Sequence, residues 1–507
     1  MNFVIIAVDC LRADRLGCYG YHRNTTPFLD SMAEESHLFE QFFAPAIPTQ
    51  PSFTTTFTGQ LPTTHGIVAH RGQWHLDDSA PFLPEILKQH GYATAAVDNL
   101  ADQHQPWFSR GFDTYLNPRQ PGTYPDCFLY NEAAINWLEH HGQDPFLLCL
   151  HYWDPHTPYM PPPHYRSLFY EGDPTTANRG SLDRFYNRPL RDWWVSDWLD
   201  RMAAEWPNAQ GKHIIDLEFV RSQYDAEVRC ADDGIKELTE ALDRLGILDD
   251  TAILVYGDHG EELGEHGVFF DHHGLYDTNI HVPLLVKWPE GDQRGKRHSG
   301  LVQHTDIAPT LLDAAQVTIP PEMDGFSLVP VLETDAQLQE KRLLLSVECT
   351  WMGKWAVRDE NWKYIRARVP DFYNGPMEEL YDLKKDPGEQ DNLAEKVPEI
   401  ARQQRDKLES ELWIRLAKGG HTEDPVLSHG ITLGKGMYEG QEKGSIGRFM
   451  KGGFDFELLP DWLFILKKGP IHKFWKMLPP GFRSGAGKLL ARGFTAKDEK
   501  SPSEKDP

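Results

Sequence analysis

The chain has 507 residues and carries 51 Lys and Arg against 76 Asp and Glu, which gives a formal net charge of −25 at pH 7. Hydrophobic residues make up 40% of it and aromatic residues 12%, enough to fill a large core, so a wholly disordered chain is excluded. Because the acidic charge repels polyanions, we expect no nucleic-acid partner. No apolar run reaches the ~18 residues that a membrane span needs, so we expect no transmembrane segment.

The six cysteines are scattered and include no C-x-x-C pair, so neither a disulfide framework nor a structural zinc site is indicated. They are Cys10, Cys18, Cys127, Cys149, Cys230 and Cys349. Residues 1–9 have the pattern of a strand, without a basic leader or the length of a signal-peptide core. We therefore expect a cytoplasmic protein with reduced, buried thiols.

Short apolar runs, partly β-branched, alternate with helical segments along the first 300 residues or so. The runs predict strands buried on both faces of a parallel sheet, at Phe3–Val8, Ala93–Val97, Phe146–Leu150, Ala252–Tyr256 and Pro283–Val286. Helices are expected at Pro27–Glu35, Leu83–His90, Asn131–His140 and Leu217–Leu245. This alternation predicts an α/β domain, in which ligands gather beyond the carboxyl ends of the strands.

Composition divides the chain further. The catalytic α/β domain is expected over residues 1–335, with a Trp-rich insertion at 164–212 that could form a lid, a substrate pocket or simply an aromatic surface cluster. Residues 336–417 are expected to form a smaller α+β subdomain, with short strands at Ala356–Arg366 and Leu380–Leu383 and a helix at Pro398–Leu416. Residues 418–507 are predicted to form an irregular extension, basic and aromatic from 447. This tail could join two copies of the chain, lie on an anionic membrane surface or pack on its own domain.

Acidic and imidazole groups follow two of the predicted strands. Asp9 ends the first strand, and Asp258-His259 follow the fourth after Gly257, which allows a tight exit. Carboxylate oxygens and imidazole nitrogens suit Zn, Mn or a similar divalent cation. The pattern therefore predicts a metal site. The alternatives are an ordinary hydrogen-bonded turn at Asp258-His259 and a helix cap at Asp9.

Thr49 lies in Pro48–Ser52, a loop that enters a predicted helix closing on Thr58-Gly59. Free backbone N–H groups at the start of a helix favour an anion. A threonine hydroxyl is a poor nucleophile unless a metal or a base lowers its proton affinity, and a cation on the predicted metal site would do so. Thr49 is thus a candidate nucleophile, with a simple N-cap as the alternative.

Histidines are concentrated in two segments. His151–His156 follows the third strand, and its prolines stiffen a loop that could bind an anion or protonate a leaving group. A solvated loop is the alternative. The run Gly264–Tyr276 adds His266, His272 and His273, some of which we expect to orient the metal ligands.

Many separate motifs follow one another in a recognisable order. They are Val8–Asp14 with Leu16–Gly20, Pro48–Ser52 with Thr58-Gly59, His65-Gly66, Gly111–Asp113, Trp153–Tyr159, Tyr224–Glu227, Asp258–Gly267, Asp324–Leu328, Trp362–Ile365, and Leu380–Leu383 with Asp386-Pro387 and Asn392-Leu393. From Phe3 to about Ala394 the chain resembles the sulfatase family of the alkaline phosphatase superfamily. The resemblance implies an α/β fold with an alkaline-phosphatase-like mixed sheet flanked by helices, and a smaller C-terminal α+β subdomain.

The resemblance also implies roles for single residues. The metal ligands of the family map to Asp9, Asp258 and His259, with the nucleophile oxygen at Thr49, and its anion-contacting histidine maps to His156. The family places a Cys or Ser, oxidised to formylglycine, where Thr49 stands. Thr is not a substrate for that modification, so the aldehyde hydrate would be absent.

Several other positions depart from the family pattern. Phe53 occupies a position where the family has an arginine. Asn99 occupies the position of a family lysine, and Asp271 or His272 that of another. Cys10 replaces an acidic residue, and His70 replaces an asparagine. The pocket is therefore expected to keep its metal but to lose several cations.

We accordingly predict a metal-dependent hydrolase of small anionic phosphate or sulfate esters. Phosphodiesters and phosphonates are preferred, because related superfamily members with Thr as nucleophile act on phosphoesters. The alternatives are a sulfatase that works without formylglycine and a catalytically inactive, anion-binding relative.

In the predicted mechanism, a metal lowers the pKa of the Thr49 hydroxyl, which attacks phosphorus or sulfur in line. The metal and His156 neutralise the non-bridging oxygens, and His151, His272 or His273 protonates the leaving oxygen. One divalent ion (Mn, Zn, Ca or Mg) is expected. A second is possible, because Asp154, His156, His272 and His273 could build another site.

Overall fold

The computed structural model describes residues 1–70, 74–102, 105–118, 126–176, 179–187, 193–207, 209–289, 295–334, 336–338, 342–371 and 375–432. These residues all belong to one unit of the chain. The predicted basic and aromatic tail, with the contact between two copies of the chain that it could make, lies outside the described residues.

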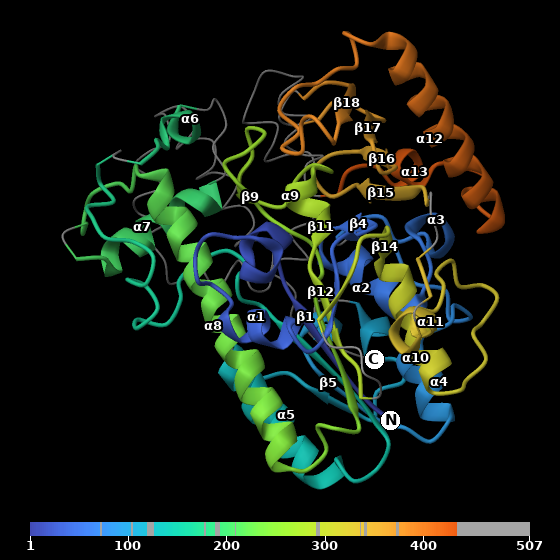
Figure 1. Cartoon of the computed structure of the whole chain (residues 1–507). Helices are drawn as coiled ribbons and strands as arrows, with labels where there is room; N and C mark the ends of the chain where they lie inside the picture. The colour runs from blue at the N-terminus through green and yellow to red at the C-terminus, as the bar shows by residue number, and fades with distance from the viewer. Residues whose placement is uncertain are drawn as a thin grey trace, which may run out of the picture. The chain divides into compact units, whose positions relative to one another are not determined.

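Eight strands form a mixed sheet within this unit (Figure 1). Their order is β13-β2-β12-β8-β1-β7-β5-β6, with bounds β1 Asn2–Val8, β2 His37–Phe39, β5 Ala93–Val97, β6 Thr114–Leu116, β7 Phe146–Tyr152, β8 Thr251–Gly257, β12 Leu284–Lys287 and β13 Lys296–His298. β8, β1, β7, β5 and β6 run parallel, whereas β12 pairs antiparallel with β8. The predicted α/β fold with a mixed sheet is confirmed.

The three central strands, β8, β1 and β7, end at one edge of the sheet. They are buried almost throughout, as a parallel sheet covered on both faces requires. Their register aligns Val8 with Gly257 on one side and with Tyr152 on the other, so the residues that follow Val8 and Gly257 emerge together. β7 runs two residues further than predicted, so His151 lies within the strand and not after it.

Helices cover both faces of the sheet (Figure 1). On one face, α1 Pro27–Ala33, α5 Cys127–His141 and α8 Leu217–Arg244 share a core with Val4, Ile6 and Val8 of β1. On the other face, α2 Thr49–Thr58, α4 Leu83–Gln89, α10 Ile307–Ala314 and α11 Val329–Glu333 share a core with Phe3, Ile5 and Ala7. All four predicted helices are present. α5 begins four residues earlier than expected, because the Asp126 side chain caps it by accepting the Leu129 N–H.

A second, smaller sheet has the order β18-β17-β16-β15-β4. Its strands are β4 Ala46–Ile47, β15 Leu344–Glu348, β16 Lys354–Arg358, β17 Trp362–Ala367 and β18 Glu378–Asp382, and α12 Pro398–Lys418 packs against β16 and β17. The predicted strand at 356–366 is wrong as one element. A turn divides it into β16 and β17, because Asp359 accepts the N–H groups of Asn361 and Trp362. β4 comes from outside the range 336–417 that was expected to form this subdomain.

The other α-helices and strands lie outside these two sheets and their main helices. They are α3 Pro62–His65, α6 Asp183–Tyr186, α7 Trp193–Glu205, α9 Asp277–Ile280 and α13 Pro425–His429, the three-stranded sheet of β3 Phe42–Phe43, β11 His281–Val282 and β14 Val302–Gln303, and the hairpin of β9 Glu262–Leu263 and β10 Phe269–Asp271. α7 belongs to the Trp-rich insertion, where Trp198 packs on Tyr159 and Phe270. This part of the insertion therefore contributes to the core. None of the described helices combines the length and the apolar character of a membrane span.

Candidate active site

The parallel strands β1 and β8 deliver the two carboxylates at the centre of the site. The Asp9 N–H donates to the Tyr152 carbonyl at 2.9 Å, and the Asp258 N–H to the Val8 carbonyl at 3.4 Å. Cys10 then turns the chain with a φ of 58° and donates its N–H to Asp258 Oδ1 at 3.2 Å. Both carboxylates are fully buried. They lie side by side because the two strands end in register.

Thr49 lies beside these two carboxylates, although it comes from helix α2 and not from the eight-stranded sheet. It is the first residue of α2, and Pro48 occupies the N-cap position, so the Thr49 hydroxyl is not the cap of this helix. Its Oγ1 lies 3.2 Å from His259 Nε2 and 3.5 Å from Asp9 Oδ2. The side chain is 3% exposed. The hydroxyl therefore faces the imidazole and the carboxylate that the sequence assigns to the metal site.

The four residues predicted as metal ligands have the arrangement of a cation site. His259 Nε2 lies 3.6 Å from Asp9 Oδ1 and 3.5 Å from Asp258 Oδ2. The other ring nitrogen, Nδ1, donates to the Gly260 carbonyl at 2.9 Å, which leaves the Nε2 lone pair for a ligand. Asp258 Oδ2 is buried and has no hydrogen-bond partner. Two carboxylates, an imidazole and a hydroxyl at this spacing fit a divalent cation.

The electrostatics of this cluster also fit a cation. Burial, and then the neighbouring Asp9 charge, raise the pKa of Asp258 to about 7. Burial acts in the same direction on Asp9, but the charges and hydrogen bonds of His156, His151 and His259 outweigh it and lower the pKa of Asp9. Burial lowers the pKa of His259, which favours the neutral imidazole that binds metals. The site thus holds a repelling pair of buried carboxylates beside a neutral imidazole.

His151 joins Asp9 to a further carboxylate that we did not single out from the sequence. His151 Nε2 lies 3.1 Å from Asp9 Oδ2, and Nδ1 lies 2.8 Å from Asp98 Oδ1. Burial lowers the pKa of His151, but the two carboxylates outweigh it and raise it to about 10. Both ring nitrogens are engaged, and the side chain is 1% exposed. Asp98 directly follows β5, so the strand-end rule that pointed to Asp9 would have found it too.

The other predicted histidines lie at different distances from this centre. His156 donates Nδ1–H to the Thr157 carbonyl at 2.6 Å, and its charge acts on Asp9. The ring of His272 lies 5.6 Å from the ring of His156 and 4.6 Å from that of His259. His273 is fully buried, with Nε2 3.0 Å from Asp271 Oδ1 and its ring 4.8 Å from that of Trp351. Of the three histidines predicted to protonate the leaving oxygen, His272 therefore has the position that best fits the task.

Asp154 does not join the histidines with which it was predicted to form a second metal site. Its Oδ2 accepts the Cys127 N–H at 3.0 Å, and its carboxyl group pairs with that of Glu227. Burial raises the pKa of both acids. The predicted site of Asp154, His156, His272 and His273 is therefore not assembled, because the loop after β7 points Asp154 toward the start of α5.

Phe53 occupies the position at which the family resemblance led us to expect an arginine. Its ring lies 4.6 Å from that of His151 and 6.4 Å from that of Phe108. The side chain is buried. An apolar ring therefore packs against the imidazole that bridges Asp9 and Asp98.

The fold and the site together define an α/β protein in which two buried carboxylates, an imidazole and a threonine hydroxyl meet at one edge of a mixed sheet. The family model described as sulfatase matches residues 1–317, which is more than half of the chain. The model described as the C-terminal part of N-sulphoglucosamine sulphohydrolase matches residues 264–417. The chain belongs to the sulfatase family of the alkaline phosphatase superfamily, and it is an ester-bond hydrolase.

Known relatives extend over most of the chain. An N-acetylglucosamine-6-O-sulfatase of Bacteroides thetaiotaomicron is 26% identical over 485 residues, covering 80% of this chain and 85% of the relative. A choline-sulfatase of Rhizobium meliloti is 24% identical over 439 residues, covering 78% and 82%.

Solved structures share the fold. A structure in complex with its substrate D-glucosamine-2-N,6-O-disulfate superposes with a TM-score of 0.64 at 22% identity, covering 84% of this chain and 99% of the other. The phosphonate monoester hydrolase of Agrobacterium radiobacter superposes with a TM-score of 0.62 at 21% identity, covering 82% and 96%.

Proposed function

We propose that this chain is a metal-dependent hydrolase of small anionic phosphate or sulfate esters, that it prefers phosphodiesters and phosphonate monoesters, and that Thr49 is its nucleophile. The observation that carries the proposal is the position of Thr49 Oγ1, 3.2 Å from His259 Nε2 and 3.5 Å from Asp9 Oδ2. Threonine cannot become formylglycine. A covalent Thr49 intermediate must therefore be released by attack of water on the phosphorus or sulfur atom.

Asp9, Asp258, His259 and the Thr49 hydroxyl would hold the metal ion. When bound, a divalent cation supplies Lewis-acid chemistry that lowers the proton affinity of a coordinated hydroxyl and attracts the substrate anion. The protein orients this set through two hydrogen bonds, one from His259 Nδ1 to the Gly260 carbonyl and one from the Cys10 N–H to Asp258. The ligands are therefore held in place before the ion arrives.

The remaining side chains act on the ester. In the first step, Thr49 Oγ1 gives its proton to solvent and bonds to phosphorus or sulfur, while the bond from that atom to the leaving oxygen breaks and its electron pair stays on that oxygen. His156 binds the non-bridging oxygens, and His272 is the side chain that we assign to the leaving oxygen. His151 does not touch the substrate in this scheme, because both its nitrogens are occupied by Asp9 and Asp98. We assign it the role of positioning Asp9.

A sulfatase that works without formylglycine is the competing function. It is favoured by relatives whose names specify sulfate esters, such as the choline-sulfatase. Thr49 favours phosphoesters instead, because the formylglycine route to release sulfate is closed. The phosphonate monoester hydrolase among the similar structures supports the phosphoester preference at the level of the fold alone.

An activity panel with metal add-back tests the proposal. The purified chain is stripped with a chelator, reloaded with Mn²⁺, Zn²⁺, Ca²⁺ or Mg²⁺, and assayed on aryl sulfates, aryl phosphodiesters and aryl phosphonates. We expect faster turnover of phosphodiesters or phosphonates, restored by metal. Turnover of sulfates alone would overturn the preference and support the competing function.

The Thr49→Ala variant tests the nucleophile. It should lose about 10³-fold or more of kcat/KM, since removal of a covalent nucleophile abolishes the main route. Thr58→Ala is the matched control, because Thr58 lies on the same helix and its hydroxyl bonds back to the Thr54 carbonyl at 2.6 Å. If Thr49→Ala leaves turnover unchanged, Thr49 is not the nucleophile. A wild-type chain that binds anions but turns over no ester would instead be an inactive relative.

A further inference from the structure

Glu261 is a buried carboxylate for which the proposed mechanism has no use. It is fully buried, and among the described residues only the Cys10 thiol approaches its oxygens as a hydrogen-bond donor. No Lys or Arg of the described residues forms an ion pair with it, and Arg12 bonds only to its backbone carbonyl, at 3.0 Å. Burying a carboxylate without a cationic partner is costly, so Glu261 needs a ligand or a proton.

The β9–β10 hairpin brings further ligands to Glu261. Glu261 directly precedes β9, and Asp271 ends β10, where it pairs in register with Glu262. The register shifts between Phe269 and Asp271, and Phe270 has a φ of 59°. Such an irregularity re-aims the side chains that follow it. As a result, His272 Nδ1 lies 3.9 Å from Glu261 Oε2 and 3.7 Å from Asp271 Oδ1.

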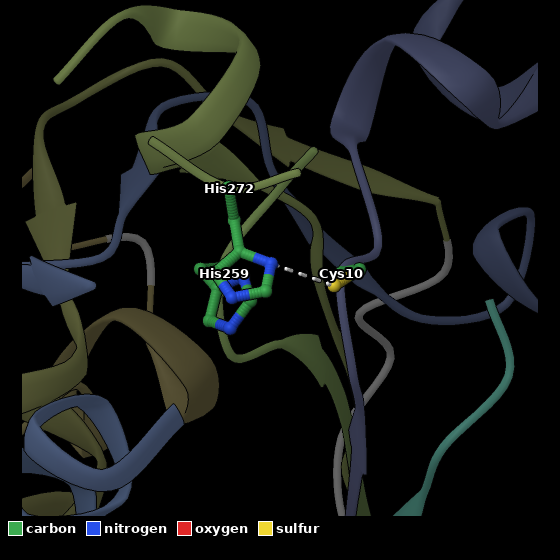
Figure 2. Close-up of side chains that lie close together, drawn as sticks. All are labelled: Cys10, His259 and His272. Carbon is green, nitrogen blue, oxygen red and sulfur yellow. Dashed lines mark hydrogen bonds between the residues drawn. The ribbon is translucent and has the colours of Figure 1, made fainter. Parts of the chain in front are cut away.

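Cys10, which lies just beyond the end of β1, approaches His272 from the larger sheet. Its Sγ lies 3.7 Å from His272 Nδ1, and the two side chains point toward one another beside His259 (Figure 2). The same sulfur lies 3.1 Å from Asp9 Oδ1, so Cys10 stands between the predicted metal ligands and the Glu261 group. The ligand atoms of Glu261, Asp271 and His272 all lie within 4.8 Å of one another.

These observations lead us to propose a second cation site, of the Zn²⁺ type, formed by Cys10, Glu261, Asp271 and His272. Ligand atoms on a tetrahedral zinc ion are about 3.3–3.8 Å apart, given bonds of about 2.0–2.3 Å. The three distances from His272 Nδ1, 3.7, 3.7 and 3.9 Å, are close to this spacing. A thiolate, an imidazole and two carboxylates form a borderline-soft donor set that suits zinc better than Ca²⁺ or Mg²⁺. On binding, the Cys10 thiol proton is released to solvent.

A second ion would make the pocket attractive to an anionic ester. Asp9, Asp258, Glu261 and Asp271 are all buried here, and a second dication would offset the negative charge that its own carboxylate ligands carry when they are ionised. With Nδ1 of His272 on the second ion, the Nε2–H can still donate a hydrogen bond to the leaving oxygen, which takes its proton from solvent. The inference extends the proposed function in this way, but the binding of the ion does not depend on which ester is cleaved.

Metal content measured on the full-length chain tests the site. The protein is stripped with a chelator, reloaded with Zn²⁺ alone, freed of excess ion and analysed by plasma mass spectrometry. We expect two zinc ions per chain in the wild type and one in Glu261→Gln. The matched control is Glu262→Gln, since Glu262 is the adjacent buried carboxylate but bonds to His266 and Thr278, and it should keep two.

Cobalt gives an independent readout of the same site. The Co²⁺-loaded wild type should show a sulfur-to-metal charge-transfer absorption that Cys10→Ser abolishes, because a thiolate is the only ligand of the proposed set that produces it. This measurement keeps the inference testable if Glu261→Gln does not fold, as judged by circular dichroism.

One zinc ion in the wild type, two ions in Glu261→Gln, or the absence of the charge-transfer absorption would each overturn the inference. Asp258→Asn separates the two sites, because it should lose the other ion and retain the cobalt–sulfur absorption. A chain that binds two ions but turns over no ester would refute the proposed function and leave the second site standing.

Discussion

His151 shows how one side chain can control the charge of the site without touching the substrate. It lies between Asp9 and Asp98, and these two carboxylates raise its pKa to about 10 although burial acts in the opposite direction. At neutral pH the ring is therefore an imidazolium that holds Asp9 ionised and fixed in place. Asp98 is itself held by the Tyr115 hydroxyl at 2.7 Å and by the Leu100 N–H at 3.0 Å. The chain from Tyr115 to Asp9 thus supports the proposed metal site from behind.

The Asp98→Asn variant tests this support. The amide cannot stabilise the imidazolium as a carboxylate does, so His151 should lose its charge near neutral pH and Asp9 its charged partner. We expect kcat on the preferred ester to fall by about 10–100-fold, the usual effect of removing a partner of a metal ligand, with a smaller change in KM.

The matched control for Asp98→Asn is Asp113→Asn. Asp113 lies near the other end of β5, where it accepts from Thr94 and pairs with Lys88. That variant should keep the kinetics of the wild type. An unchanged kcat in Asp98→Asn would show that His151 does not need the second carboxylate.

The sequence predicted where the residues at strand ends lie, whereas their roles as metal ligands and nucleophile stay predictions. Asp9, Asp258 and His259 follow β1 and β8 directly, and Thr49 opens a helix, so motif and position agree. Glu261 was not found, because its environment depends on the hairpin that folds His272 back over it. Asp154 was misassigned, since a single residue type in a loop does not reveal which way it points.

At the scale of elements, the connection from β4 to α2 joins the two sheets at Thr49, the proposed nucleophile. Ala46 and Ile47 pair with Val347 and Glu348 of β15, and Thr49 begins α2 two residues later. The smaller sheet therefore fixes one end of the segment that carries Thr49, although most of its strands come from far along the chain. The smaller sheet thus contributes to the geometry of the site, while the proposed ligands come from outside its described residues.

The turn after β8 depends on close packing against α9. The Gly260 N–H donates to the Asn279 carbonyl at 2.7 Å, and a Cβ at Gly260 would lie 2.0 Å from the Thr278 carbonyl oxygen. Gly260→Ala must therefore move backbone next to His259. We expect it to lower the free energy of unfolding by about 1–3 kcal/mol, measured by urea denaturation with an unchanged m-value.

Gly388→Ala is the control for this packing effect. A Cβ there would meet only the Gln390 Cγ, at 3.8 Å, which is an ordinary contact. Its free energy of unfolding should stay within about 0.5 kcal/mol of that of the wild type. A Gly260→Ala variant as stable as this control would show that the β8 exit tolerates displacement.

Long elements were predictable and short ones were not. The buried runs and the amphipathic helix α8 carry a clear periodicity, so their positions differ from the prediction by a few residues. β4, β9 and β11 have two residues each, too few to show any period. β4 and β11 pair with strands far along the chain, and β9 pairs with β10 across a register shift, so this information lies in the tertiary fold. The two-residue strands therefore could not be read from the sequence.

For the whole molecule, the charge of −25 makes the local arrangement of cations decisive. An acidic surface does not draw in an anionic ester, so the substrate depends on the positive charge gathered at the edge of the sheet. His151 and the proposed metal sites provide that charge within a buried cluster, where screening by salt is weak. With the proposed ions bound, the site would thus carry positive charge within a protein of negative net charge.

His266 links the hairpin beside the site to the C-terminal part of the chain, and its protonation should tune the stability of the whole unit. Nδ1 lies 3.1 Å from Glu262 Oε1, and Nε2 lies 3.1 Å from the Gly388 carbonyl. Burial lowers the pKa of His266, but Glu262 outweighs it and raises it to about 9. Both nitrogens act as donors only when the ring is charged.

The sign of the resulting pH dependence follows from this raised pKa. The unfolded chain has an ordinary histidine pKa of about 6.5, so the folded state binds the proton more tightly. The stabilisation is complete below pH ~6.5 and is lost as the pH rises through about 9, with a magnitude of up to about 3 kcal/mol. We expect the free energy of unfolding of the wild type to fall over this window, measured by urea denaturation between pH 6 and pH 10.

His266→Asn isolates the contribution of this ring, because asparagine tolerates the φ of 48° at this position but does not titrate. The difference in unfolding free energy between wild type and variant should be largest at pH 6 and vanish near pH 10. His213→Asn, at an exposed histidine paired with Asp200, should follow the wild-type curve throughout. A wild type and a His266→Asn variant whose curves run parallel from pH 6 to pH 10 would show that His266 is not held as an imidazolium between Glu262 and the Gly388 carbonyl.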